Sequence, residues 1–160
     1  MNTEPLPALL IRQAERSDTA RLVEVYCSSG FFDFAPSCPD RGLLQATVVC
    51  YLDLLESTPK SIIFLVAETN AEVAGFSIAR VTSRRTWEIQ IGVNAAQRKR
   101  GIGGALMRRT FTEMRGRGPR DCEAIVNSNN AASIRTVTPF FQSSENYEAL
   151  PGFVKFRSSW

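Results

Sequence analysis

Hydrophobic positions along the chain follow two spacings, and their order predicts a mixture of helices and strands. Between Leu44 and Leu55 apolar residues recur every three or four positions, which is the spacing of one face of a helix. The run 61–68 is instead rich in β-branched and apolar residues, as strands are. Glycines and prolines separate such segments. The pattern predicts strands at 9–11, 61–68, 73–81, 86–93, 122–126, 147–150 and 153–156, and helices that follow Ser17 or Asp18, end before Pro59, and cover 101–115 and 130–137.

The length and composition fit one globular domain over residues 1–160. A chain of 160 residues can bury a substantial core, and an apolar fraction of 44% is ordinary for a soluble protein. No apolar run reaches the length of a membrane span, so we expect no membrane partner. The segment Met1–Pro7 contains Glu4 and two prolines, which is not the pattern of a signal peptide. We therefore expect a cytoplasmic protein.

The cysteines, and the lack of histidine, exclude several kinds of site. Cys27, Cys38, Cys50 and Cys122 have no C-x-x-C spacing, and the chain contains no histidine. A Cys/His zinc site and a Cys–His nucleophile are therefore impossible, and an all-cysteine zinc site is poorly spaced. We expect no metal, and free thiols in a reducing compartment.

The net charge of +3 conceals a strongly basic segment. Residues 98–120 contain eight cations and one anion, a net +7, whereas the rest of the chain carries 11 cations and 15 anions, a net −4. A local basic patch indicates an anionic partner near this segment. A phosphate-bearing cofactor and nucleic acid both remain open at this point, beside a helix face that only contacts solvent.

The stretch Gln97–Leu106 has three consecutive cations before three glycines, at the beginning of a predicted helix. An apolar run, Ile89–Val93, precedes it. Backbone N–H groups at a helix N-terminus form, together with the helix dipole, an anion site that suits a pyrophosphate. The stretch lacks the Lys-Ser/Thr of a Walker A loop, and Leu106 stands where a dinucleotide fingerprint needs its third glycine. A glycine-rich helix start without a ligand is the alternative.

Two segments, together with the order of the elements, resemble one protein family. The first is Arg98-x-x-Gly101-x-Gly103, and the second is Val126–Ile134, with the sequence V-N-S-N-N-A-A-S-I. They resemble the coenzyme A loop and the V-x-x-x-N-x-A-[AS]-I segment of the GCN5-related N-acetyltransferases, the GNAT family. The opening segment 11–18 is similar to the family's usual start. Because both motifs lie on the expected elements in the expected order, the resemblance covers essentially the whole chain.

The resemblance implies a fold, a reaction and a cofactor. The GNAT fold is α/β (α+β), with a mixed, mostly antiparallel central sheet of six to seven strands flanked by about four helices. The implied reaction is N-acetyl transfer from acetyl-CoA, the co-substrate, to a primary amine by direct attack in a ternary complex. The implied partner is an amine acceptor, either a small molecule or a protein amine, and a homodimer is compatible with the sequence.

The resemblance also implies which residues hold the cofactor. Backbone N–H groups of residues 98–104 would bind the pyrophosphate, and the pantetheine arm would follow the strand at Ile91 and Val93. The Val93 N–H is then a candidate oxyanion donor, and Gly92 indicates a close backbone approach or a bulge. The cofactor-binding residues expected are Ile91, Val93, Arg98, Lys99, Arg100, Gly101, Ile102, Gly103, Gly104, Asn130 and Ser133.

Glu88 is the candidate general base. The attacking amine must lose a proton, because a lysine with a pKa near ~10.4 is mostly protonated at neutral pH. In the histone-acetylating branch of the family the base is a glutamate ten residues before the first motif residue of the loop, and Glu88 stands ten residues before Arg98. Strand alternation directs Glu88 away from the face that carries Trp87 and Ile89. A glutamate that simply faces solvent is the alternative.

The general acid is where the chain departs from the family. Val137 replaces the tyrosine that is usual seven residues after the asparagine matched by Asn130, and Pro139 interrupts the helix. Tyr147 or Tyr26 could protonate the departing thiolate instead, or the thiolate could leave unaided. Tyr147 joins the base as the second catalytic candidate.

Two other functions stay open. A GNAT-fold module that binds coenzyme A without transferring acetyl would explain Val137. A nucleic-acid-binding module is less favoured, because the basic segment offers only Phe111, which the helical spacing assigns to an apolar face. Phe31, Phe32 and Phe34 belong to a proline-containing loop, where they either line a pocket or pack on the core.

Overall fold

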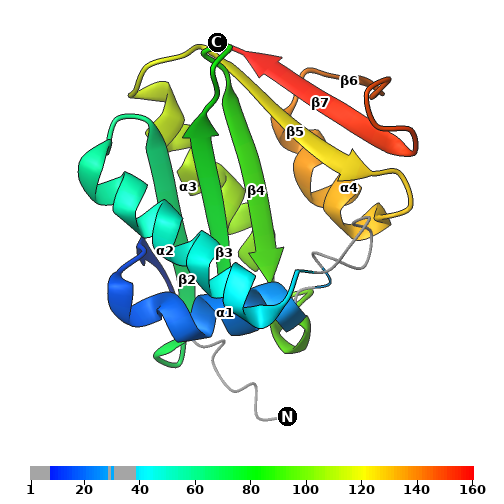
Figure 1. The fold of residues 1–160 in the computed structure, drawn as a ribbon. Coiled ribbons are helices and arrows are strands. Elements are labelled where there is room, and N and C mark those ends of the chain that lie inside the picture. Colours follow the sequence, from blue (N-terminus) through cyan, green and yellow to red (C-terminus); the bar gives the residue numbers. More distant parts are fainter. Residues whose placement is uncertain (1–7, 29, 31–38) are drawn as a thin grey trace.

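The computed structural model describes residues 8–28, 30 and 39–160, which form a sheet with helices on both faces (Figure 1). Phe31, Phe32 and Phe34 lie outside the described residues. The strands are β1 (Leu9–Gln13), β2 (Ile62–Thr69), β3 (Glu72–Val81), β4 (Trp87–Val93), β5 (Asp121–Asn127), β6 (Ser143–Asn146) and β7 (Phe153–Ser159). The helices are α1 (Thr19–Ser28), α2 (Arg41–Ser57), α3 (Ile102–Arg115) and α4 (Ala131–Val137), with short 3-10 turns at Arg16–Asp18, Ala95–Gln97 and Thr138–Phe140.

The seven strands form one sheet in the order β1-β2-β3-β4-β5-β7-β6. Neighbouring strands are antiparallel except for β4 and β5, which run parallel. Helices α1 and α2 cover one face over β2, β3 and β4, and α3 and α4 lie on the opposite face (Figure 1). The mixed, mostly antiparallel α/β architecture predicted from the sequence is confirmed.

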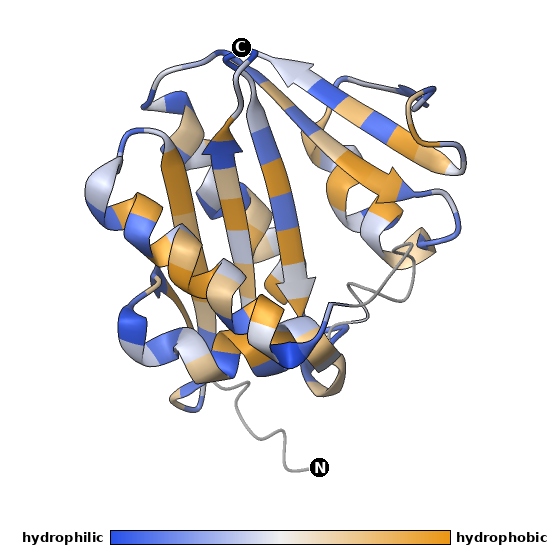
Figure 2. Ribbon diagram, in the orientation of Figure 1, coloured by the Kyte–Doolittle hydropathy of each residue, from blue (hydrophilic) through white to orange (hydrophobic). Residues whose placement is uncertain are grey.

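Two buried hydrophobic clusters join the layers, one on each face of the sheet. The cluster under α1 and α2 contains all four positions that helical spacing indicated in α2. In β2, Ile62 and Phe64 belong to this cluster, whereas Ile63 and Leu65 belong to the cluster under α3. Successive strand residues therefore supply opposite cores, because strand side chains alternate between the faces of a sheet (Figure 2).

The closing hairpin differs from the sequence prediction. Residues 147–150 form a turn rather than a strand, since the Leu150 N–H donates to the Tyr147 carbonyl, and Gly152 has a φ of 84°. The partner of β7 is instead the polar strand β6, whose four residues are all exposed. No apolar pattern marks β6, because its conformation comes from main-chain pairing with β7.

The bulge considered at Gly92 is wrong. β4 pairs with β3 in continuous register from Trp87 to Val93. A Cβ at Gly92 would lie 2.5 Å from Cε1 of Phe76. The glycine thus makes room for a core ring, which in turn contacts Tyr26 with 4.2 Å between the ring centroids.

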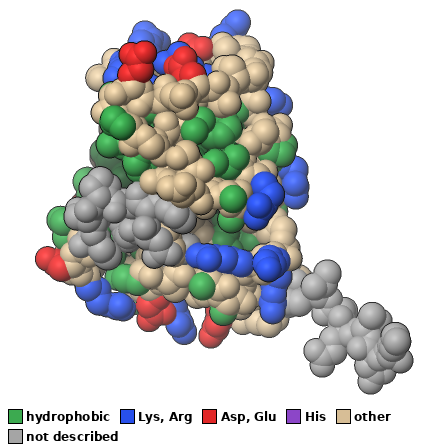
Figure 3. Space-filling model, turned by 90° about the vertical axis from the view of Figure 1, so that its right-hand side faces the viewer, with side chains coloured by type: hydrophobic (Ala, Val, Ile, Leu, Met, Phe, Trp, Pro, Cys, Tyr) green, Lys and Arg blue, Asp and Glu red, His purple; other side chains and the backbone are tan. Residues whose placement is uncertain are grey.

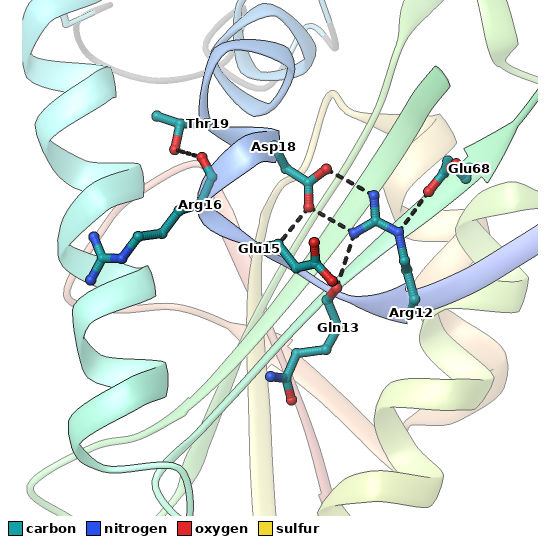
Figure 4. Close-up of polar contacts among 7 residues, drawn as sticks. All are labelled: Arg12, Gln13, Glu15, Arg16, Asp18, Thr19 and Glu68. Atoms are coloured by element: carbon teal, nitrogen blue, oxygen red, sulfur yellow. Dashed lines mark hydrogen bonds and ion pairs between the residues drawn. The ribbon is translucent and has the colours of Figure 1, made fainter. Parts of the chain in front are cut away.

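Arg12 of β1 binds both the neighbouring strand β2 and the turn that precedes α1 (Figure 4). Its guanidinium donates to both carboxylate oxygens of Asp18 at 2.8 and 2.9 Å, and to Glu68 of β2 at 2.6 Å. Asp18 also accepts from the Glu15 N–H at 2.8 Å. Of Ser17 and Asp18, the two residues expected to cap the helix, Asp18 does not cap α1, because its carboxylate closes the preceding turn and binds Arg12. With Asp18 only 5% exposed, the cluster ties β1, α1 and β2 together.

We expect Asp18→Asn to lower the free energy of unfolding at neutral pH by about 2–3 kcal/mol, because a buried charge-assisted pair is lost. Burial alone would raise the pKa of the Asp18 carboxyl, but hydrogen bonds from Arg12 and Glu15 outweigh burial and lower that pKa. A carboxyl with a lowered folded-state pKa stabilises the fold above its unfolded value near 3.8. That contribution disappears as the pH falls through the folded-state pKa. Urea unfolding over a pH series should therefore show the difference between wild type and variant shrinking below about pH 4.

Asp53→Asn is the matched control for this prediction. Its carboxylate also pairs with an arginine, Arg16, at 2.7 Å, but it is 58% exposed. Exposed ion pairs contribute little, so the expected change is below about 1 kcal/mol. Equal losses in the two variants, or a loss at Asp18 that does not depend on pH, would contradict the prediction.

Candidate functional site

The candidate site begins where β4 and β5 separate. These parallel strands pair only at Trp87↔Cys122 and Glu88↔Glu123. Beyond that point β4 stays paired with β3 and β5 stays paired with β7 along its whole length. Each strand is held from its outer side, so the two diverge toward the lower end of the sheet (Figure 1).

Main-chain groups of β4 face this separation. The Asn94 N–H donates to the Ala74 carbonyl of the preceding strand segment at 2.8 Å. Because successive N–H groups of a strand point to opposite edges, those of Val93 and Ile91 point toward β5. The two strand residues predicted to lie along the pantetheine arm are thus the ones whose main chain faces the opening.

The loop after β4 has a left-handed backbone at two positions. Asn94 accepts from the Ala96 N–H at 3.0 Å and starts a 3-10 turn. Lys99 has a φ of 62° and Gly101 a φ of 76°. The left-handed region costs a non-glycine residue about 1–2 kcal/mol, so Lys99 is strained whereas Gly101 is not. The chain then enters α3 at Ile102, and the first N–H groups of a helix have no partner within it.

Gly103 is the point where α3, α4 and β4 converge. A Cβ built on Gly103 would lie 3.2 Å from Cγ2 of Thr136 in α4, 3.8 Å from Cγ2 of Val93 and 3.9 Å from Cδ1 of Ile91. The predicted residues of the loop and of β4 are therefore brought together around one glycine. A larger side chain at this position would press on Thr136 and force α3 away from α4 or β4.

A buried pair of hydroxyls fixes α3 on the sheet. Ser77 Oγ of β3 and Thr110 Oγ1 of α3 lie 2.6 Å apart, and both residues are fully buried. Thr110 donates its proton to the Leu106 carbonyl, so Ser77 donates to Thr110. This pair sets the position of the helix that carries the loop.

Asn130 and Ser133 meet each other at the beginning of α4. The Asn130 side chain caps the helix by accepting from the Ser133 N–H at 3.1 Å. Both residues follow the lower end of β5, across the separation from β4. At the other end of α4, Val137 is only 2% exposed and belongs to the core cluster under α3.

Glu88 occupies the last paired position of β4, on the face opposite α3. Its carboxylate accepts from Arg80 of β3 at 3.1 Å, and its side chain is 25% exposed. The register pairs Glu88 with Glu123 of β5, so the two carboxylates stand on neighbouring strands. Glu123 in turn pairs with Lys155 of β7 at 3.4 Å.

Tyr147 joins the same row of charged residues from the turn after β6. The Lys155 ammonium lies 4.2 Å from the centre of the Tyr147 ring, and Lys155 is only 3% exposed. Tyr26 is different, because it lies in the core under α1, where burial raises its pKa. Of the two tyrosines considered as acids, Tyr147 is the one beside the Glu123–Lys155 pair.

Sequence reasoning did not single out Glu123 or Lys155. The available signal was a lysine between two apolar residues, Val154 and Phe156, in a predicted strand. A lysine there must find a counter-charge on the other face of the sheet. Which carboxylate it meets depends on the order of the strands.

The basic segment is only partly available to a ligand. Arg109 and Arg117 both pair with Glu113, and Arg117 also donates to the Pro59 carbonyl at 3.0 Å. Lys99 and Arg100 are exposed. In Figure 3, Lys and Arg side chains lie on the lower part of the face, and others lie at its top beside Asp and Glu side chains.

Within the described ranges, no cluster of three His, Cys, Asp or Glu residues could hold a metal ion. Among the helices of these same ranges, none is both long enough and apolar enough to cross a membrane.

Comparisons with known proteins give one family and many similar folds. The model of the acetyltransferase (GNAT) family matches residues 20–138. A search of curated proteins finds no significant match.

Three solved structures illustrate the similarity of fold. An N-acetyltransferase from Staphylococcus aureus Mu50 has a TM-score of 0.75 at 19% identity, with 95% of this chain and 98% of that chain covered. The Salmonella typhimurium protein yncA, solved with acetyl-CoA, has a TM-score of 0.71 at 23% identity, covering 95% and 94%. The paia N-acetyltransferase of Thermoplasma acidophilum, in complex with coenzyme A, has a TM-score of 0.74 at 14% identity, covering 96% and 99%.

Proposed function

The chain belongs to the acetyltransferase (GNAT) family, and from this premise we propose that it transfers an acetyl group from acetyl-CoA to a primary amine by direct attack in a ternary complex. The observation that carries the proposal is the convergence of β4, α3 and α4 at Gly103, beside two strands that separate. Acetyl-CoA supplies an activated thioester. The residues of this chain would hold it, orient it and handle the proton.

The residues present fit coenzyme A. A Cβ at Gly103 would lie only 3.2 Å from Cγ2 of Thr136, so the glycine lets α3 and α4 approach β4 closely beside the proposed course of the pantetheine arm. The N–H groups of residues 102–104 would receive the pyrophosphate, with the exposed cations Lys99 and Arg100 beside it. Two proteins of similar fold were solved with acetyl-CoA or coenzyme A, which supports this cofactor. The N–H of Val93, directed toward β5, is the proposed oxyanion donor.

Glu88 is proposed to accept the proton of the attacking amine. Its carboxylate lies at the head of the β4–β5 separation and is oriented by Arg80 at 3.1 Å. The amine would approach over β5 and β7, on the side that α1 and α2 leave uncovered (Figure 1). A partly exposed carboxylate on the same strand can take the proton through bound water.

Tyr147 is proposed to protonate the departing thiolate. The buried ammonium of Lys155 holds its ring by a cation–π contact at 4.2 Å. The family's usual position for this acid is closed in this chain. Val137 is packed in the core at 2% exposure, where a tyrosine would overpack its surroundings.

Direct attack, without an acetyl-enzyme, fits the cysteines that the structure describes. Burial raises the pKa of the Cys122 thiol to about 12, so it stays protonated at neutral pH. Cys27 and Cys50 are exposed free thiols, and the chain has no histidine that could activate them.

Gly103→Glu and Gly103→Gln are expected to weaken acetyl-CoA binding by at least about tenfold, or 1.4 kcal/mol. Either side chain would occupy the convergence point, and glutamate would also add a negative charge to the anion site. Binding by the wild type should weaken as salt rises, because phosphate contacts are screened. Isothermal titration with acetyl-CoA, and in parallel with an oligonucleotide, measures these effects.

Gly116→Ala, at the far end of α3, is the control. Its Cβ would meet only the Glu113 carbonyl oxygen at 3.7 Å, so binding should stay close to that of the wild type. Circular dichroism would show whether the Gly103→Glu variant is folded. If the folded variant bound acetyl-CoA with wild-type affinity, the loop would not be the binding site of the pyrophosphate. Tighter binding of the oligonucleotide than of acetyl-CoA would favour the nucleic-acid-binding module.

Glu88→Gln is expected to lower turnover roughly 10²-fold or more while acetyl-CoA affinity stays nearly intact. The loss should be largest at the low end of the pH range, where more of the amine is protonated. Steady-state rates by thiol release, over a pH series, measure this. Glu72→Gln, at an exposed residue of β3, is the control and should leave turnover unchanged. If the Glu88 variant turned over at the wild-type rate, Glu88 would not be the base and would only pair with Arg80.

Tyr147→Phe is expected to lower turnover by roughly 10²-fold or less, at the low end for a general acid, because a thiolate leaves readily. Tyr51→Phe, whose ring packs edge-on against Phe64, is the matched control for loss of a phenol. The same thiol-release assay with a broad amine panel applies. If acetyl-CoA binds tightly but no amine is acetylated, the chain is the non-catalytic coenzyme A module instead.

A further inference from the structure

Helix α3 begins with main-chain N–H groups that have no partner within the helix. Gly101 caps the helix without a side-chain hydrogen bond, and the first turn contains no acidic residue. The Ala105 N–H donates to the Gly101 carbonyl at 3.0 Å and is the first to bond back into the helix. The N–H groups of residues 102–104 therefore point beyond the helix end. These are the groups proposed to bind the pyrophosphate of coenzyme A.

The cations around this turn differ in what already binds them. Arg100 donates to the side chain of Gln97 at 2.9 Å, and Arg109 pairs with Glu113 at 3.0 Å. Among the residues that the structure describes, Arg108 makes no ion pair and no side-chain hydrogen bond. Its charge is therefore not neutralised by the part of the protein that surrounds it.

The position of the Arg108 guanidinium ties it to the anion site. Its Nη1 atom is 3.4 Å from the Cβ position of Gly104, so the side chain turns back toward the N-terminus of the helix. Helical side chains lean in this direction, and residues four apart lie on one face. Because Gly104 has no side chain, the guanidinium can lie against the first turn. The cation thus stands beside the turn whose N–H groups have no partner within the helix.

The two sets of donors face different directions. The N–H groups point along the helix axis, past the first turn. The Arg108 guanidinium instead lies beside that turn. A pyrophosphate at the helix end uses the first set, and the guanidinium is left for a second anionic group on the same ligand. Coenzyme A has such a group, because its ribose carries the pyrophosphate at the 5′ position and a separate phosphate at the 3′ position.

The chemistry of the two groups matches. A phosphate monoester carries a charge of about −1.5 to −2 at neutral pH and has three strong acceptor oxygens. A guanidinium presents paired N–H donors that suit two of those oxygens at once. No carboxylate competes for Arg108, since the one acidic residue of α3, Glu113, is bound by Arg109 and Arg117.

We propose that Arg108 binds the 3′-phosphate of coenzyme A and so makes the protein distinguish acetyl-CoA from its 3′-dephospho form. The proposal rests on the proposed function, because the pyrophosphate must occupy the N-terminus of α3 for the ribose to lie beside Arg108. It adds a specificity-determining residue on the second turn of α3, outside the glycine-rich loop.

Coenzyme A and 3′-dephospho-coenzyme A test the proposal, because they differ only in this phosphate. In isothermal titration the wild type should bind coenzyme A about five- to tenfold more tightly, as expected for a paired contact that stays partly exposed. Arg108→Ala should remove the preference by weakening coenzyme A alone, and alanine suits a helix interior. Arg108→Lys should retain part of it, because lysine keeps the charge but not the paired donors.

Arg115→Ala is the control for the loss of one positive charge. Arg115 is also exposed on α3, about two turns or roughly 10 Å further from the loop. Its removal changes the net charge equally, so it should weaken both ligands slightly and to the same extent, as a screened long-range effect. The ratio of the two affinities should stay at the wild-type value.

That ratio decides the proposal. Equal affinities for the two ligands in the wild type, or an unchanged ratio in Arg108→Ala, would overturn it and leave acetyl transfer intact. An equal loss for both ligands in Arg108→Ala would place this guanidinium on the pyrophosphate and would also overturn it. Only a wild type that bound neither ligand would remove the proposed function as well.

Discussion

The structure depends on one constraint, which is that β4 and β5 can pair over two positions and no further. β4 is bound along its length to β3, and β5 is bound along its length to β7. Past the shared positions Trp87↔Cys122 and Glu88↔Glu123, each strand follows its own antiparallel ladder, so the two strands move apart. Main-chain groups that would otherwise pair are left facing each other across the separation, and a ligand with its own donors and acceptors can satisfy them.

Helix α3, which packs against this region, is held on the sheet by a hydrogen bond as well as by apolar contacts. A hydroxyl pair, Ser77 and Thr110, sits in an otherwise apolar interface with no exposure to water. A directional bond in a low-dielectric core holds the helix at one rotation and one height. The result is that Gly103 is held against both Thr136 and β4, and the strained φ of Lys99 is maintained by the elements on either side of the loop.

Charged residues on this face form a row across the four strands β3, β4, β5 and β7. The row runs from Arg80 through Glu88 and its register partner Glu123 to Lys155, and it ends against the ring of Tyr147, which follows β6. Because each carboxylate has a cation on its outer side, two glutamates can stand on adjacent strands without an uncompensated charge. One row of residues thereby runs from the proposed base to the proposed acid.

The sequence by itself determined the helices and strands whose hydrophobic spacing marks the residues that they bury. Helical spacing in α2 and alternation in β4 identified the residues that became core, because burial of an apolar face is decided locally by its period. The loop motif could also be recognised from the sequence. The left-handed φ of Gly101 and the tight packing at Gly103 each require a glycine at a fixed place in the chain.

Other features were decided only by the tertiary structure. β6 has four exposed polar residues and is a strand solely because β7 lies beside it. Gly92 is a glycine because of the Phe76 ring on the neighbouring strand, and Asp18 can be buried because the Arg12 guanidinium of β1 turns back to bind it. The partnership of Glu123 with Glu88 and Lys155 follows from the strand order β4-β5-β7. Local pattern cannot specify such neighbours, because they depend on which edges of the sheet meet after the hydrophobic faces have been buried.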